Sequence, residues 1–259
     1  KNGRTVVKNV GYSADVTRTR DCLAALGAKI TVENGNAAVY GIQNSAANDF
    51  FGEKDFILNT GESGSTLRFL MPVAAALGIR AEFICDSGLL CRPIDEMINV
   101  LSAHGEKIEK TNRGYLLSGK IHPGKYVIDG TVSSQFASGL AFALPLLSGE
   151  STLEITGKLS SESYFDMTLN VLGQSVIKFK KIGYKSIIFN KSDYCLPDET
   201  VVPGDFSSAA FMLALGALGG DVTVSGLSKH DSGGQGDEKI VDLLRRFGAE
   251  ITVGNDFIR

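Results

Sequence analysis

The stretch CLAALGAKITV (residues 22–32) decides the fold, because its design recurs three more times along the chain. Each copy is an amphipathic run, then a glycine, then a strand-like pattern containing Ile. The other copies are NVLSAHGEKIE (99–109), LNVLGQSVIK (169–178) and LLRRFGAEITV (243–253). A glycine at this point is typical of a helix end, where the chain turns through a left-handed conformation before a strand. The glycines are Gly27, Gly105, Gly173 and Gly248.

A second repeat alternates with the first. A Ser-containing cluster of small residues precedes a long apolar run in GESGSTLRFLMPVAAALG (61–78), VSSQFASGLAFALPLLSG (132–149) and DFSSAAFMLALGALGG (205–220). Repeats of one helix–glycine–strand pattern at such long spacing predict duplicated units that pack into globular domains rather than a solenoid. We expect the apolar runs at 140–147 and 211–218 to lie in the core. The third helix is short before Gly173, which leaves open a deletion there.

Composition narrows the classes of protein. The chain has 259 residues, of which 43% are hydrophobic, and a net charge of −3, so it offers no basic field for nucleic acid. No apolar run reaches the length of a membrane span. The four cysteines form no CxxC pair, which favours reduced thiols in a cytoplasmic protein and no metal site. The chain opens at Lys1 and stops at Arg259 inside strand-like patterns, so we expect it to be part of a longer protein.

The Ser-rich helix starts have two interpretations. A single Ser or Thr at a helix start is explained by capping, which satisfies one free amide. Ser133, Ser134 and Gln135 together, or Ser63 to Thr66 around Gly64, exceed what capping needs. Hydroxyls and free amides at a helix N-terminus form an anion site, since the donors and the helix dipole point the same way. From the residues alone, both interpretations stay open.

CRPIDEM (91–97) is a further candidate for ligand binding. Arg92 precedes Pro93, which suits the first turn of a helix. A guanidinium held there can bind a carboxylate or phosphate through two parallel hydrogen bonds. Alternatively, Arg92 pairs with Asp95 or Glu96 on the surface.

Together these motifs resemble the 3-phosphoshikimate 1-carboxyvinyltransferase (EPSP synthase) family. The motifs that carry the resemblance, in order, are GESGSTLRFL, Arg92-Pro93, DGTVSSQF (129–136), SESYFDMTL (161–169), PGDFSSAAF (203–211) and QGD (235–237). The resemblance covers the whole chain but only somewhat more than half of a family member. It implies the inside-out α/β fold, in which each domain is built from βαβαββ units. It also implies a first domain at 1–197 and an incomplete second domain at 198–259, with the crossing at 195–205.

The resemblance also implies a reaction and a set of binding residues. The family transfers the enolpyruvyl group of phosphoenolpyruvate to the 5-hydroxyl of shikimate 3-phosphate and releases phosphate, without a metal or organic cofactor. It implies a monomer and, because Gly64 leaves room for the inhibitor, sensitivity to glyphosate. Carried over by motif, the shikimate 3-phosphate ligands are Ser133, Ser134, Gln135, Ser161 and Tyr164. The phosphoenolpyruvate ligands are Gly64, Arg92 and Gln135.

The chain departs from the family pattern in some places. The family's Lys-Ser motif should precede Lys1, and its proton-transferring Asp and Glu should follow Arg259, so catalytic residues are not assigned. Glu162 and Ser163 stand where many members have Lys-Pro, and Cys91 stands where a basic residue is common.

Three alternatives remain at this stage. One is the related enolpyruvyl transferase for UDP-N-acetylglucosamine, whose reactive Cys has a spacing to the Arg that neither Cys85 nor Cys91 matches. Another is a non-catalytic binding fragment that works only with a partner. The RNA-terminal-phosphate cyclases are disfavoured by the acidic balance of the chain.

Overall fold

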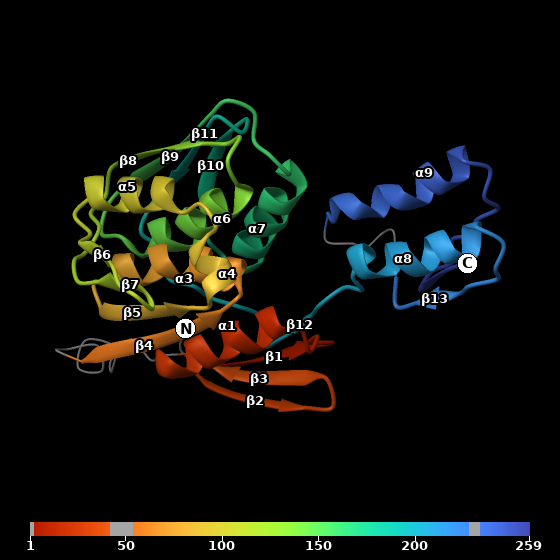
Figure 1. The fold of residues 1–259 in the computed structure, drawn as a ribbon, viewed down its shortest axis with the longest axis horizontal. Coiled ribbons are helices and arrows are strands. Elements are labelled where there is room, and N and C mark those ends of the chain that lie inside the picture. The colour runs from red at the N-terminus through yellow and green to blue at the C-terminus, as the bar shows by residue number, and fades with distance from the viewer. Residues whose placement is uncertain (1–2, 42–53, 228–233) are drawn as a thin grey trace.

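The computed structural model describes residues 3–41, 54–227 and 234–259 (Figure 1). Three four-stranded sheets form the larger part of the molecule, and helices lie between them. A smaller part, coloured blue in Figure 1, follows the last strand of that body and stands to its side.

The second and third sheets have the same topology. The second sheet has the order β4-β5-β7-β6 and the third β8-β9-β11-β10; in each, the first two strands are parallel and the others antiparallel. The second unit comprises β4 (Asp55–Gly61), α3 (Gly64–Leu77), β5 (Arg80–Cys85), α4 (Ser87–Leu90), α5 (Asp95–Ala103), β6 (Ile108–Lys110) and β7 (Gly114–Leu117). The third comprises β8 (Lys125–Asp129), α6 (Ser134–Ala143), a 3-10 turn η1 (Leu144–Leu146), β9 (Ser151–Thr156), α7 (Glu162–Gln174), β10 (Phe179–Ile182) and β11 (Ser186–Phe189). Both units therefore have the predicted βαβαββ order.

The first sheet is completed by a strand from far along the chain. Its own unit supplies β1 (Arg4–Lys8), α1 (Ala14–Ala25), β2 (Lys29–Glu33) and β3 (Asn36–Tyr40). β12 (Glu199–Val201) pairs with β1 in parallel, at the edge that β4 and β8 occupy in the other two sheets. The predicted domain boundary after residue 197 falls just before β12, whose pairing with β1 joins it to the first sheet.

The fourth unit is smaller. It contains α8 (Phe206–Ala217), β13 (Val224–Ser225), a 3-10 turn η2 (Gly236–Lys239), α9 (Ile240–Arg246) and β14 (Phe257–Ile258). β13 and β14 form an antiparallel pair. Its buried apolar residues form a core cluster of their own, separate from the cluster of the three sheets among the described residues.

The helices α3 and α6 are the centre of the larger core. They are apolar almost all round, pack directly against each other and lie between the sheets (Figure 1). The backbones approach closely at Gly139, where an added Cβ would lie 2.1 Å from the carbonyl oxygen of Arg68. The sheets therefore lie outside and two apolar helices inside, and the predicted burial of 140–147 is confirmed.

The predicted burial of 211–218 is wrong for most of that segment. Phe211 and Leu218 are 75% and 87% exposed, whereas Leu213 is buried. α8 is apolar on every face, but the described residues of the fourth unit cover only the face that carries Phe206, Ala209 and Leu213. Apolar composition therefore predicted the helix correctly and its burial only on one face.

All four repeat helices end in one hydrogen-bonding pattern. At Gly27, Gly105 and Gly248 the chain has φ between 95° and 110°, and the next amide donates five residues back, for example from Ala28 to the carbonyl of Leu23. This is the Schellman arrangement. In the third unit α7 continues past Gly173, and Val176 takes the left-handed position at φ 61°. The predicted helix end at Gly173 is therefore wrong.

Candidate active site

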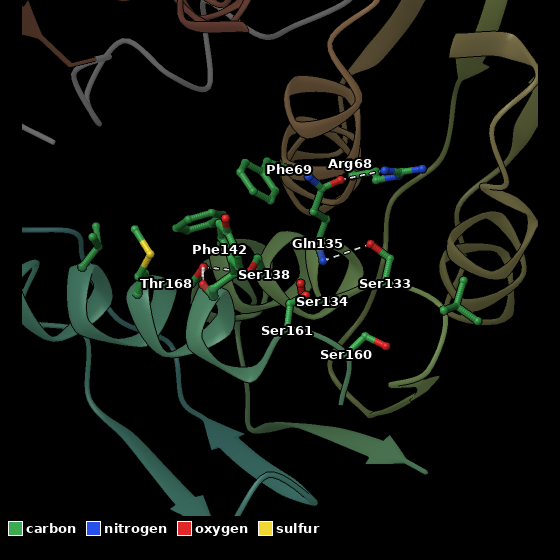
Figure 2. Close-up of a pocket in the computed structure, with 14 residues that line it drawn as sticks. Arg68, Phe69, Ser133, Ser134, Gln135, Ser138, Phe142, Ser160, Ser161 and Thr168 are labelled. Carbon is green, nitrogen blue, oxygen red and sulfur yellow. Dashed lines mark hydrogen bonds between the residues drawn. The ribbon is translucent and has the colours of Figure 1, made fainter. Parts of the chain in front are cut away.

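A cavity of about 700 Å³ opens where α6 and α7 begin (Figure 2). Its lining residues come from α3, α6, α7 and the turns before the last two helices. They are Arg68, Phe69, Val132, Ser133, Ser134, Gln135, Ser138, Phe142, Ser160, Ser161, Tyr164, Met167, Thr168 and Val171. All five residues predicted to hold shikimate 3-phosphate are among them.

The start of α6 supplies hydroxyls and amides to the cavity. Ser133 is the N-cap, and its Oγ accepts the amide of Gln135 at 3.2 Å. Ser134 is 8% exposed, and its hydroxyl makes no hydrogen bond to any part of the chain that the structure describes. A hydroxyl left free at a helix N-terminus is suited to an anion, because the helix dipole adds to its donor.

The start of α7 points into the same space. Ser161 is its N-cap, but it adopts the left-handed region at φ 56° and caps no amide with its side chain. Ser160 is fixed just before it, because its amide donates to the carbonyl of Gly130 at 2.7 Å and its Oγ to that of Thr131 at 3.1 Å. Figure 2 shows the four serines gathered between the two helix starts. Left-handed backbone conformations at residues other than glycine, such as that of Ser161, concentrate at functional sites.

Arg68 supplies positive charge at the edge of the cavity. Its Nη1 donates to Oε1 of Gln135 at 2.7 Å, as Figure 2 shows, and its Nη2 to the carbonyl of Pro93 at 3.2 Å. No hydrogen bond or ion pair joins it to a described carboxylate. Burial and then the neighbouring Arg92 hold the pKa of Arg68 below its ordinary value. Two cations this close indicate a place for an anion.

Gly64 lies close to the guanidinium groups of both Arg68 and Arg92. A Cβ built on Gly64 would lie 3.3 Å from Nη1 of Arg68 and 3.3 Å from Nη1 of Arg92. The surface pairing of Arg92 is not found: its side chain makes no ion pair with any described residue, and Glu96 instead accepts the amide of Asp129. Gly64 and Arg92 thus adjoin the cavity through Arg68, although neither lines it.

Tyr164 lies at the rim of the cavity, 48% exposed. Its hydroxyl donates to Oδ2 of Asp237 at 2.8 Å, and Asp237 belongs to the fourth unit. The pKa of Tyr164 is above its ordinary value: the Ser207 hydroxyl lowers it, but the Asp237 carboxylate and burial outweigh that effect.

The other wall of the cavity is apolar. Phe69 and Phe142 meet edge to face, with ring centroids 5.5 Å apart. Behind them, the hydroxyls of Ser138 and Thr168 are 2.7 Å apart and tie α6 to α7. An anionic end and an apolar wall together suit a ligand with a carbon ring and a phosphate.

Comparison with known proteins identifies the family. The family model described as "EPSP synthase (3-phosphoshikimate 1-carboxyvinyltransferase)" matches residues 1–259. The chain belongs to the EPSP synthase family. Among named relatives, the 3-phosphoshikimate 1-carboxyvinyltransferase of Clostridium kluyveri is 37% identical over 254 residues, covering 96% of this chain and 57% of that protein. The one of Clostridium novyi is 33% identical, covering 99% and 60%.

Solved structures agree on the fold. An EPSP synthase structure from Acinetobacter baumannii aligns with a TM-score of 0.74 at 20% identity, covering 99% of this chain and 58% of that one. A second from the same organism aligns with a TM-score of 0.73 at 21% identity. The predicted inside-out α/β fold is confirmed. The chain spans somewhat more than half the length of these EPSP synthases, so the activity of a whole family member is not established for it.

Sequence reasoning missed two residues of the site, Arg68 and Ser160. Arg68 carried a signal: it is the one charged residue of α3 and stands one helical turn after Gly64, so both face the same side. Ser160 carried no signal beyond its neighbour Ser161. Within the described ranges, three or more His, Cys, Asp or Glu side chains never group to hold a metal ion, and no helix is long and apolar enough to cross a membrane.

Proposed function

We propose that this chain carries the shikimate 3-phosphate site of an EPSP synthase. The protein to which the site belongs transfers the enolpyruvyl group of phosphoenolpyruvate to the 5-hydroxyl of shikimate 3-phosphate. A proton adds to C3 of phosphoenolpyruvate, the hydroxyl adds to C2, and the tetrahedral intermediate then eliminates phosphate. No residue of this chain is assigned to the proton transfers.

One observation carries the proposal: the starts of α6 and α7 face one cavity, where the hydroxyls of Ser134 and Ser161 and the guanidinium of Arg68 have no carboxylate partner among the described residues. Ser133, Ser134 and Ser161 hold the phosphate of shikimate 3-phosphate, since helix amides and hydroxyls are natural phosphate donors. Gln135 and Tyr164 contact the rest of that ligand. The apolar wall at Phe69 and Phe142 accommodates its ring.

Phosphoenolpyruvate binds next to shikimate 3-phosphate, at Gly64 and Arg92. Gln135 lies close to both ligands, because its side chain accepts a hydrogen bond from Arg68. Positioning two polyanions side by side is the main demand of the reaction, and fixed cations meet it. The absence of a side chain at Gly64 supports the predicted sensitivity to glyphosate. We also propose that the protein acts as a monomer in the cytoplasm, on small molecules and not on nucleic acid or membranes.

The related transferase for UDP-N-acetylglucosamine is disfavoured by the position of Cys85. Its thiol is buried 3.4 Å from Oγ1 of Thr60 and does not line the cavity. Burial raises the pKa of the Cys85 thiol, although the hydrogen bond from Thr60 opposes that shift. A thiol in this setting is structural.

Calorimetric titration of residues 1–259 with shikimate 3-phosphate tests the proposal. Ser134→Ala removes one hydrogen bond to a charged group and should weaken binding about tenfold or more. Ser151→Ala is the matched control, because it removes a buried, unpartnered hydroxyl elsewhere in the same unit and should leave affinity unchanged. Equal binding by the Ser134 and Ser151 variants, or no binding by the unaltered chain at millimolar ligand, would contradict the proposal.

A further inference from the structure

The phenol of Tyr164 is held by the fourth unit of the chain. Its hydroxyl and that of Ser207, in the first turn of α8, both donate to Oδ2 of Asp237, at 2.8 Å and 2.6 Å. Tyr164 lies in the first turn of α7, one helical turn from Ser161, so the contact ends at the cavity itself.

Hydrogen bonds of the nearby Gln235 side chain hold the turn that carries Asp237. The side chain of Gln235, two residues earlier, accepts the amide of Phe206 at 2.9 Å and donates to the carbonyl of Gly204 at 2.8 Å. These two bonds join the turn at 235–237 to the start of α8. Asp237 therefore moves with α8 and with the segment that leads into it from β12.

Gly236 permits the close approach. A Cβ built there would lie 2.4 Å from Oγ and 3.1 Å from Cβ of Ser163, so a larger residue would require the Ser163 side chain or the turn to shift. A glycine between Gln235 and Asp237 thus lets the turn lie against α7 and lets the carboxylate reach the phenol. Each residue of the QGD motif has a separate role in this contact. Gln235 anchors the turn to the start of α8, Gly236 leaves room beside Ser163, and Asp237 accepts the hydrogen bond from Tyr164.

We infer that Asp237 is a positioning residue that fixes Tyr164 at the rim of the cavity and so couples the fourth unit to ligand binding there. The inference rests on the proposed function only for the identity of the ligand. A half-exposed tyrosine side chain without a hydrogen-bond partner loses conformational entropy when ligand binds, which weakens binding. A side chain that is already held has lost that entropy before ligand binds. The contact therefore favours binding whenever the fourth unit stands as it does here.

Four variants of the chain test the inference by calorimetry with shikimate 3-phosphate. Asp237→Ala and Tyr164→Phe should each weaken binding about three- to tenfold, the effect of immobilising one side chain. The double variant should bind no more weakly than Tyr164→Phe alone, because Asp237 acts only through the Tyr164 hydroxyl. Asp237→Asn should retain most of the affinity, since its amide oxygen still accepts from Tyr164.

Glu250→Ala is the control, because it removes an exposed carboxylate from the same unit and should not change binding. Asp237→Ala binding as tightly as the unaltered chain would overturn the inference, as would effects that multiply in the double variant. If the unaltered chain binds and only these results fail, the proposed function stands and the positioning role falls.

A second readout needs no ligand. Asp237→Ala and Tyr164→Phe should each speed proteolytic cleavage of the crossing segment 195–205 to a similar extent, with no further increase in the double variant. Because Asp237→Asn should cleave like the unaltered chain, this comparison separates loss of the contact from general unfolding. Unchanged cleavage in Asp237→Ala would overturn the inference even if no ligand bound.

Discussion

Ser161 and Val176 both hold a left-handed backbone that residues with a side chain rarely adopt, at φ 56° and 61°. They bracket α7, one at its start and the other just past its end. The conformation costs such a residue about 1–2 kcal/mol. The two positions differ in what accompanies that cost: Ser161 faces the cavity, whereas Val176 is exposed at a helix end.

Val176→Gly should raise the free energy of unfolding by about 1 kcal/mol, because glycine adopts this conformation without a steric penalty. Val176 is 59% exposed, so little buried area is lost. Urea denaturation measures the gain. Val176→Ala removes the exposed side chain but keeps a Cβ, so an equal gain in both variants would show that the backbone is not the cause.

Ser161→Gly should change stability and binding in opposite directions. Relief of the left-handed conformation should stabilise the chain by about 1 kcal/mol. Loss of the hydroxyl should weaken shikimate 3-phosphate binding about tenfold. Ser161→Ala, which loses only the hydroxyl, should weaken binding without the gain in stability. Denaturation and calorimetry on both variants check this, and unchanged affinity in both would remove Ser161 from the site.

The positive-φ positions also show what the sequence could not reveal. Glycine marks three of the four helix ends, and there the sequence prediction was correct. In the third unit a valine occupies the left-handed position, because hydrogen bonding and packing of α7 outweigh the local preference of the residue. The sequence pattern therefore predicts a helix end at Gly173, although that residue lies within α7.

At the scale of elements, the close packing of α3 on α6 places the site. Gly139 lets the backbone of α6 approach the carbonyl of Arg68 in α3. That approach brings the Arg68 side chain to Gln135, one turn before Gly139. The position of the Arg68 guanidinium therefore depends on a helix contact at Gly139, a residue that does not line the cavity.

Gly139→Ala should destabilise the larger core by more than about 1 kcal/mol. Alanine in a helix would otherwise gain up to about 1 kcal/mol over glycine, but a Cβ 2.1 Å from a backbone oxygen forces the two helices apart. Gly173→Ala is a matched control, since nothing lies within 4 Å of its added Cβ and it should stabilise. Urea denaturation compares the two, and the same sign of change in both would contradict the helix contact.

The sequence predicted the elements better than their surroundings. Periodicity and the second repeat were enough to find α3, α6 and α8. The repeat predicts a Ser-rich opening for all three, and a serine is the N-cap of α3 and α6, whereas Asp205 is the N-cap of α8. Whether an apolar helix is covered depends on neighbours that the pattern does not contain, which is why the burial of α8 was overestimated. The partner of Arg92 was likewise undecided in the sequence, because nearby Asp95 and Glu96 were equally available to it.

At the scale of the whole molecule, the larger core contains a carboxyl group that links its stability to pH. Oε1 of Glu106 accepts the amides of Lys107, Ser118 and Gly119, and Oε2 is buried without a partner. Burial raises the pKa of Glu106 above its ordinary value of 4.5, although the three hydrogen bonds oppose that shift. The folded state therefore holds this proton at pH values where the unfolded chain has lost it.

Stability contributed by Glu106 should fall as pH rises from about 4.5 through the raised pKa of the folded state. Glu106→Gln cannot lose a proton and should lack that decline. Urea denaturation from pH 4 to pH 8 gives the difference in unfolding free energy between the two proteins. Across that window the unfolding free energy of the unaltered chain should fall relative to that of the variant. A difference independent of pH would contradict a raised pKa of Glu106 in the folded state.

The candidate site lies in the part of the molecule that contains the larger of the two core clusters. The cavity is lined by α3, α6, α7 and the turns before the last two helices, and the fourth unit reaches its rim through Asp237. The resemblance of the motifs to the EPSP synthase family predicted which residues gather there. The contact across the two units could not be predicted, since QGD and Tyr164 are far apart in the sequence and neither motif shows its partner.

The most direct test of the central claim is a crystal structure of residues 1–259 with shikimate 3-phosphate. We predict that the phosphate lies between the starts of α6 and α7, with its oxygens about 3 Å from the hydroxyls of Ser134 and Ser161. The ring should lie against Phe69 and Phe142. A ligand bound away from these helix starts, or one whose phosphate faces the apolar wall, would contradict that claim.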